Sequence, residues 1–142
     1  AGINVLRPYL PKEENDIKHK CVIGVVEGDT HDIGKNLVKI MLETAGFEMI
    51  DLGRDVPLQR FVDTAKEVGA ELICLSTLMT TTMGGMETVI HLLEEAGIRD
   101  QVKVMVGGGP ISQRFADRIG ADGYSTTAVE AVKLAKRLLD IA

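Results

Sequence analysis

One histidine in one loop is the residue of this 142-residue chain that is best placed for chemistry. His31 follows an apolar stretch, residues 21–26, and a helical pattern begins directly after it. Asp29 lies two residues before the histidine, where its carboxylate could accept a hydrogen bond from one ring nitrogen and leave the other free. This pairing is typical of a metal-ligating histidine, although a solvated or helix-capping histidine is the alternative. Gly34 allows a tight turn or the close approach of a ligand.

Two later apolar stretches end in loops that also suit a ligand. Residues 76–83 read Ser-Thr-Leu-Met-Thr-Thr-Thr-Met, which offers hydroxyls for hydrogen bonds and apolar side chains that could pack against a flat ring. Ser76 could also reach Asp29 if the strands before the two loops are neighbours. Residues 107–109 are three glycines, which suit close backbone approach to a ligand or a tight turn. Ordinary strand-to-helix connections are the alternative for both loops.

The spacing of histidines and cysteines argues against a zinc site, which needs three or four protein ligands. His19 precedes the first apolar stretch, His91 lies within a helical pattern, and Cys21 and Cys74 fall inside apolar stretches. A histidine without such companions favours a metal whose other ligands are not protein, as in an iron or cobalt tetrapyrrole. The glycine spacing matches neither a P-loop nor a dinucleotide fingerprint. A phosphorelay receiver is disfavoured because the third apolar stretch does not end in aspartate.

Apolar stretches alternate with helical patterns along most of the chain. The predicted strands are residues 21–26, 48–52, 72–76, 102–106 and 122–125. The predicted helices are residues 33–45, 57–69, 83–96, 112–120 and 128–141. This order predicts an α/β fold, a doubly wound five-stranded parallel sheet with helices on both faces. The three loops then lie at the carboxyl edge of one sheet, where ligands bind.

Composition excludes several classes of function. The formal net charge of −5 and the pI near 5.2 give no electrostatic basis for binding nucleic acid. No apolar run approaches the ~18 residues of a membrane-spanning helix, and there is no signal-peptide pattern. Two cysteines in predicted strands indicate reduced core thiols and a cytoplasmic protein.

The first residues differ in character from the rest of the chain. Residues 1–10 carry an apolar set that resembles the last turns of a helix, and residues 11–16 form a charged linker that begins with proline. This opening segment is too short to bury its own apolar face. We therefore expect residues 1–19 to be the remnant of a preceding domain plus linker, and residues 20–142 to be the binding domain.

Taken together, the three loops resemble a known family signature. The elements Asp29-x-His31-x-x-Gly34, Ser76-x-Leu78 and two glycines at 107–108 occur in the order and at the distances of the cobalamin-binding domains of methionine synthase, corrinoid methyltransferase proteins and B12-dependent mutases. The resemblance runs from residue 20 to the C-terminus and implies a Rossmann- or flavodoxin-like cobalamin-binding fold. Residues 80–83 most resemble small methyl-carrier corrinoid proteins of methanol and methylamine systems.

The resemblance also implies roles for individual residues. His31 would be the lower ligand of cobalt, with the cofactor's own tail base displaced (base-off/His-on binding). Asp29 would hold the other ring nitrogen, Ser76 would extend this network, and all three would be catalytic. The residues that would bind the cofactor are Thr30, Asp32, Ile33, Gly34, Ser76, Leu78, Met79, Thr80, Gly107, Gly108, Gly109 and Tyr124.

The implied function is group transfer shared with partner proteins. Cobalamin would carry a methyl group on cobalt between a substrate:corrinoid methyltransferase and an acceptor methyltransferase that uses a folate or a thiol. In the family a helical N-terminal cap covers the corrin, and residues 1–10 resemble its last turn. Two alternatives remain: a cobalamin-binding regulatory or light-sensing module, and the B12 domain of an adenosylcobalamin mutase. The upstream sequence would distinguish these three.

Overall fold

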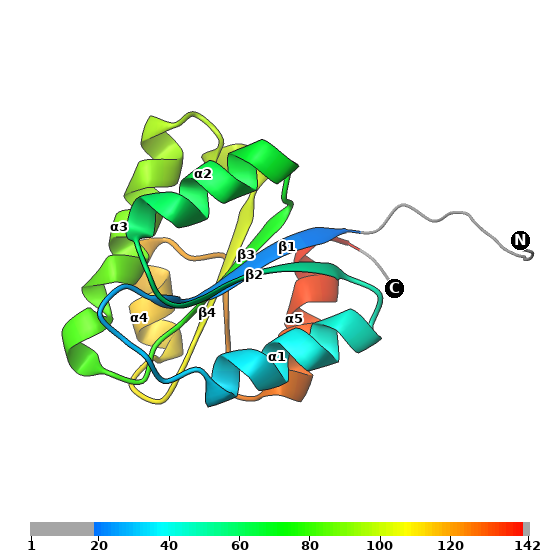
Figure 1. The fold of residues 1–142 in the computed structure, drawn as a ribbon, viewed down its shortest axis with the longest axis horizontal. Coiled ribbons are helices and arrows are strands. Elements are labelled where there is room, and N and C mark those ends of the chain that lie inside the picture. Colours follow the sequence, from blue (N-terminus) through cyan, green and yellow to red (C-terminus); the bar gives the residue numbers. More distant parts are fainter. Residues whose placement is uncertain (1–18, 141–142) are drawn as a thin grey trace, which may run out of the picture.

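Strands and helices alternate strictly through residues 19–140, the part of the chain that the computed structural model describes (Figure 1). The strands are β1 (Lys20–Val26), β2 (Glu48–Val56), β3 (Leu72–Ser76), β4 (Lys103–Gly107) and β5 (Gly123–Ser125). The helices are α1 (Ile33–Thr44), α2 (Leu58–Val68), α3 (Gly84–Glu95), α4 (Gln113–Ile119) and α5 (Ala128–Leu138). Two short 3₁₀ helices, Thr80–Thr82 and Arg99–Gln101, complete these elements.

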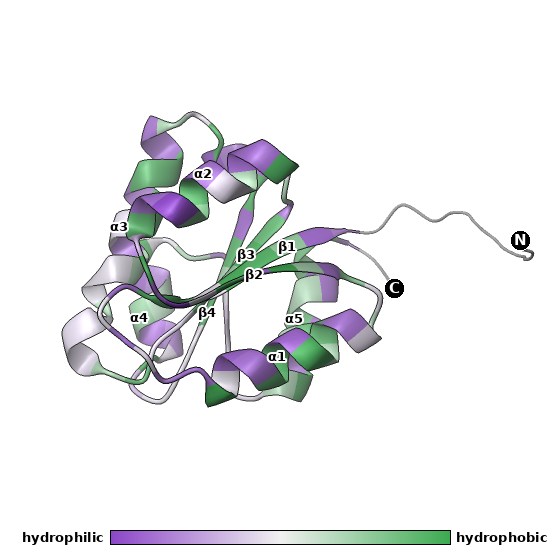
Figure 2. Ribbon diagram, viewed as in Figure 1, coloured by the Kyte–Doolittle hydropathy of each residue, from purple (hydrophilic) through white to green (hydrophobic). Residues whose placement is uncertain are grey.

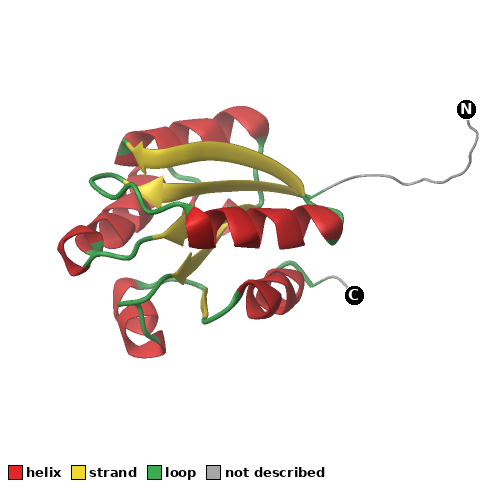
Figure 3. Cartoon of the chain, turned by 60° about the horizontal axis from the view of Figure 1, so that its bottom comes forward, coloured by secondary structure: helices red, strands yellow, loops and turns green. Residues whose placement is uncertain are grey.

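All strand pairs are parallel, and the strand order is β2-β1-β3-β4-β5. Helices α1 and α5 cover one face of the sheet and α2, α3 and α4 cover the other, as Figures 1 and 3 show. The apolar strands lie between the two layers of helices (Figure 2), and α1 also exposes three apolar side chains, Ile33, Leu37 and Ile40. The two resulting cores include Phe61 of α2 on one face and Leu42 of α1 on the other. The predicted doubly wound α/β fold is confirmed.

The strand order reverses direction between β1 and β3, which places the ligand-binding position of this fold there. From β1 the chain crosses to β2 on one side and then returns to β3 on the other. Val25 of β1 pairs in register with Ser76 of β3. The two loops that follow these strands therefore start side by side.

Several element ends follow from local signals. The hydroxyl of Ser112 accepts a hydrogen bond from the backbone N–H of Phe115, and that of Thr127 accepts one from Glu130, so these side chains are the N-caps of α4 and α5. Strand β2 runs to Val56, four residues beyond the prediction. It is the edge strand and half exposed, so its later residues lack the apolar pattern that marks a buried parallel strand.

Three other predictions of the element ends and termini compare as follows. Residues 80–82 form a separate 3₁₀ helix before α3, which therefore begins one residue after the predicted start. Helix α5 ends at Leu138, three residues before the predicted end. The expected helical remnant in residues 1–10 lies outside the described residues. Among residues 19–140, no helix has the length and apolarity needed to cross a membrane.

Both cysteines are free and buried within the sheet. Cys21 and Cys74 lie on adjacent strands with their sulfur atoms 3.4 Å apart. Burial raises the pKa of the Cys21 thiol, and the neighbouring thiol adds to this effect. Cys21 is therefore a protonated core residue, as its place in an apolar stretch indicates.

Candidate functional site

A buried aspartate holds the histidine of the β1–α1 loop. The side chain of Asp29 has no exposed surface, and each of its oxygens accepts two hydrogen bonds. Oδ1 accepts from the backbone N–H of His31 at 2.9 Å and lies 2.7 Å from the ring Nδ1 of the same residue. Oδ2 accepts from the hydroxyl of Thr77 at 2.6 Å and from the backbone N–H of Leu78 at 2.7 Å. The carboxylate thus joins the loops that follow β1 and β3.

These bonds determine where the protons of the pair lie. Burial opposes the ionisation of Asp29, but the hydrogen bonds from Thr77, His31 and Leu78 outweigh it and hold the pKa of that carboxyl well below its usual range. An ionised carboxylate can only accept, so the hydrogen of the His31 ring lies on Nδ1. Nε2 is the ring nitrogen left outside this pairing, and the side chain is 56% exposed. The geometry suits ligation of a metal through Nε2.

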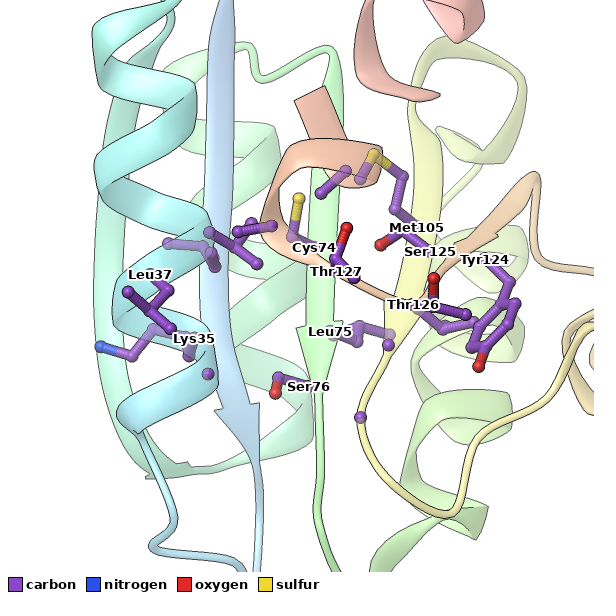
Figure 4. Close-up of a pocket in the computed structure, with 18 of the residues that line it drawn as sticks. Lys35, Leu37, Cys74, Leu75, Ser76, Met105, Tyr124, Ser125, Thr126 and Thr127 are labelled. Carbon is purple, nitrogen blue, oxygen red and sulfur yellow. The ribbon is translucent and has the colours of Figure 1, made fainter. Parts of the chain in front are cut away.

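Thr77 takes the place in this network that we predicted for Ser76. Successive strand residues point to opposite sides, so the two hydroxyls at the end of β3 separate. The hydroxyl of Thr77 donates to Asp29 and can accept from the hydroxyl of Thr82. Ser76 instead lines a cavity beside the network, at the arrowhead of β3 in Figure 4. The prediction of a Ser76–Asp29 contact is therefore corrected.

That cavity runs from the histidine into the space between the sheet and helices α1 and α5 (Figure 4). Its volume is about 480 Å³, and its walls are mainly apolar. The cavity lining includes eight residues that the sequence singled out: His31, Gly34, Ser76, Leu78, Gly107, Gly108, Gly109 and Tyr124. The other predicted cofactor-binding residues are not part of this lining: Thr30, Asp32, Ile33, Met79 and Thr80. They lie in the loops and helix starts outside the cavity, and their role stays a prediction.

Sequence reasoning missed the floor of the cavity and one of its walls. Ile23, Cys74 and Met105 form the floor and lie in register across β1, β3 and β4, so they share one face of the sheet. Strand alternation alone would have placed them opposite α1 and α5. The wall comes from residues 125–128 at the start of α5. It follows the fifth strand at the same edge as the three loops, which is the signal that could have found it.

Gly34 and Gly108 both line the cavity, but the space around the two glycines differs. A Cβ at Gly34, in the first turn of α1, would meet no atom within 4 Å, so the space beside it is open. A Cβ at Gly108 would lie 1.8 Å from the backbone oxygen of Thr77, and the φ of this glycine is +130°. Gly108 is therefore required by the approach of the β4–α4 turn to the network around Asp29. The open position at Gly34 is the one that suits a ligand.

A buried lysine beside the cavity serves the fold. Lys35 is 3% exposed, and its ammonium donates to both oxygens of Asp51 on β2 at 2.9 Å. Burial opposes ionisation of Asp51, but the hydrogen bonds and charge of Lys35 lower the pKa of its carboxyl. In Figure 4 the Lys35 nitrogen points away from the other labelled residues. The pair joins α1, a wall of the cavity, to the edge of the sheet.

Within residues 19–140, no group of three or more His, Cys, Asp or Glu side chains is arranged to hold a metal ion. His19 lies at the other end of β1 and pairs with Glu71, and His91 lies on α3 beside Glu87 and Glu94. Among the three histidines, His31 is thus the candidate ligand at the cavity.

Comparison with known proteins identifies the family of this chain. The family model described as the B12 binding domain matches residues 19–133. A dimethylamine corrinoid protein of Methanosarcina mazei is 54% identical over 140 residues, which cover 98% of this chain and 84% of the relative.

Two solved structures show the same fold. The monomethylamine corrinoid protein of Methanosarcina barkeri superposes with a TM-score of 0.82 and 41% identity, over 84% of this chain and 57% of that one. The methanol:cobalamin methyltransferase complex MtaBC from the same organism superposes with a TM-score of 0.80 and 35% identity, over 85% of this chain and 46% of that one. The chain spans about half the length of these two solved chains. On the match to residues 19–133, the chain belongs to the B12-binding domain family.

Proposed function

We propose that this domain binds a corrinoid with Nε2 of His31 as an axial ligand of its cobalt and serves as a methyl carrier. The observation that carries the proposal is the pairing of His31 with a buried, ionised Asp29, which leaves Nε2 free at the mouth of a cavity. A lone, oriented imidazole suits a metal that brings its other ligands with it.

The residues present fit such a cofactor. The cavity begins at His31, has mainly apolar walls and contains the open position beside Gly34, so it can receive the displaced tail of a base-off corrinoid. When bound, the corrinoid supplies the metal that carries the methyl group. His31 supplies the axial nitrogen. Asp29 keeps Nδ1 of this histidine protonated and holds the imidazole ring in one orientation. The hydroxyl of Thr77 completes the hydrogen bonding of the carboxylate.

We propose that the methyl group reaches and leaves the domain through two partners, a substrate:corrinoid methyltransferase and an acceptor methyltransferase that uses a folate or a thiol. The similarity to corrinoid proteins of methylamine systems and to the MtaBC complex supports this assignment. The side chain of His31 lies at an exposed edge of the sheet, where a second protein can approach the bound cofactor. A preceding helical cap domain, expected from residues 1–19, would cover the corrin between transfers.

Reconstitution tests the proposal directly. The cofactor-free domain is expected to bind hydroxocobalamin one-to-one, with the optical spectrum of a displaced tail base. The reduced Co(II) form should show nitrogen splitting from one imidazole in its EPR spectrum. The loaded domain should then accept a methyl group from a methylamine when the corresponding methyltransferase is added. Cobalamin that dialyses away with an unchanged spectrum would refute the proposal.

A bulky side chain at Gly34 should block the cavity without harming the fold. Gly34→Leu is expected to weaken cobalamin binding by about 10-fold or more, because overpacking a filled site costs about 1–3 kcal/mol. The free domain should be at least as stable as before, since glycine is a poor helix former. Gly84→Leu is the matched control, because Gly84 also begins a helix and a Cβ there would likewise meet no atom within 4 Å. Equal cobalamin affinity of the two variants would show that the tail of the cofactor does not occupy this cavity.

A further inference from the structure

A bulge in the edge strand brings a second aspartate to the histidine loop. Between Gly24 and Val26 of β1, the paired positions of β2 advance by three residues instead of two. The additional residue leaves Asp55 in the left-handed region, with a φ of 50°. Aspartate tolerates this conformation better than most residues, but it is still uncommon outside glycine. The bulge therefore aims Asp55 out of the regular ladder, which is a frequent use of such irregularities near functional sites.

Asp55 bonds the backbone of the histidine loop at two points, one before and one after the Cα of Asp29. Its Oδ1 accepts from the N–H of Gly28 at 2.8 Å, and its own N–H donates to the carbonyl of Asp29 at 2.8 Å. The preceding residue, Glu27, adds a bond from the same loop to α2, where its carboxylate accepts from the N–H of Leu58 at 3.3 Å. On the opposite side, the carboxylate of Asp29 is bonded to the loop after β3. The backbone of Asp29 is thus held from β2 and its side chain from β3.

We propose that Asp55 is a positioning residue for His31, acting through Asp29. The carboxylate of Asp29 orients the imidazole only if its own backbone is fixed, and the two bonds from Asp55 fix that backbone from the β2 side. Without them, the bonds to Thr77 and Leu78 still hold the Asp29 side chain, and the N–H of Asp29 still donates to the carbonyl of Val26 at 3.0 Å. The peptide before Gly28 and the peptide after Asp29, however, lose their bonds to β2. The effect on cobalt rests on the proposed function, whereas the effect on the imidazole ring does not.

Two substitutions separate the carboxylate of Asp55 from the bulge itself. Asp55→Gly removes the bond to Gly28 but retains the backbone N–H, and glycine adopts a φ of +50° freely, so the bulge should persist. Asp55→Asn keeps an oxygen that can accept from Gly28 and also tolerates the left-handed region. The asparagine variant is therefore the matched control for the glycine variant.

The first readout is the tautomer of His31 in the cofactor-free domain, measured by long-range ¹H–¹⁵N NMR of the ring nitrogens. The wild type and Asp55→Asn should show one dominant Nδ1–H form, whereas Asp55→Gly should show a mixture. In the second readout, Asp55→Gly should bind hydroxocobalamin up to about 10-fold more weakly, the lower end of the range for outer-shell partners, with a smaller nitrogen splitting in EPR.

The outcomes separate this proposal from the one on which it partly rests. A folded Asp55→Gly domain with the wild-type tautomer would overturn the positioning role, whatever the cofactor does. A wild-type domain that fails to bind cobalamin would overturn the proposed function, while the tautomer measurement would still decide the role of Asp55.

Discussion

His31→Ala is expected to abolish the nitrogen splitting in the EPR spectrum of the Co(II)-loaded domain. In the proposed complex, Nε2 of His31 is the axial nitrogen, and neither His19, which pairs with Glu71, nor His91, which lies beside Glu87, lines the cavity. Loss of an outer-shell partner typically lowers activity by about 10–100-fold. Methyl transfer should slow by at least this factor, because here the ligand itself is removed. Cobalamin binding should weaken by at least as much as in the variants that change only a partner of His31, but it should remain detectable, since the cavity still holds the tail of the cofactor.

The fold should tolerate this substitution. The side chain of His31 is 56% exposed, and the backbone N–H at position 31 still donates to Asp29 when the ring is absent. His91→Ala is the matched control, because His91 is an exposed histidine, 63% accessible, on helix α3. An unchanged nitrogen signal in His31→Ala would show that another base, such as the cofactor's own tail, ligates the cobalt.

The sheet was predictable from the sequence because its central strands are buried on both faces. Such strands read as continuous apolar runs, and β3 appears in the structure with the predicted ends. The edge strand β2 is half exposed, so its extension to Val56 and its bulge left no apolar signal. The bulge is also what brings Asp55 to the histidine loop. A functional irregularity of this kind cannot be found from periodicity.

The site was predictable as far as the loops, and less so at the level of single hydroxyls. Asp29 and His31 are two residues apart in one loop, so their contact depends on local geometry alone. The third member of the network follows a different strand. A shift of one position at the end of β3 decides whether Ser76 or Thr77 faces Asp29, and in the structure it is Thr77. The need for glycine at position 108 was equally hidden from the sequence, because it is set by the backbone of Thr77, which is distant along the chain. Long-range packing decides such positions, and spacing along the chain does not show it.

Asp29→Asn should destabilise the domain as well as weaken the cobalt–imidazole bond. Each carboxylate oxygen accepts a backbone N–H, one from His31 and one from Leu78. An amide has one oxygen, so either orientation leaves a buried N–H facing an NH₂ group, at a cost of about 1–3 kcal/mol. If the NH₂ group faces the ring, it also favours the tautomer whose hydrogen lies on Nε2. We expect about 10–100-fold weaker cobalamin binding and a less negative Co(II)/Co(I) potential.

The dependence of this loss on pH identifies its cause. The folded-state pKa of Asp29 is lowered, so its contribution to stability is fully present above the unfolded value of about 3.9 and is lost as the pH falls toward the folded value. The difference in unfolding free energy between wild type and Asp29→Asn, measured with urea, should therefore be constant from about pH 5 to 7 and shrink below about pH 4.

Asp122→Asn is the control, because Asp122 accepts the backbone N–H of Val104 and pairs with Arg99 at the opposite edge of the sheet. It should lose stability without changing the His31 tautomer or the cobalt potential. Wild-type potential and tautomer in Asp29→Asn would limit Asp29 to a structural role in its loop.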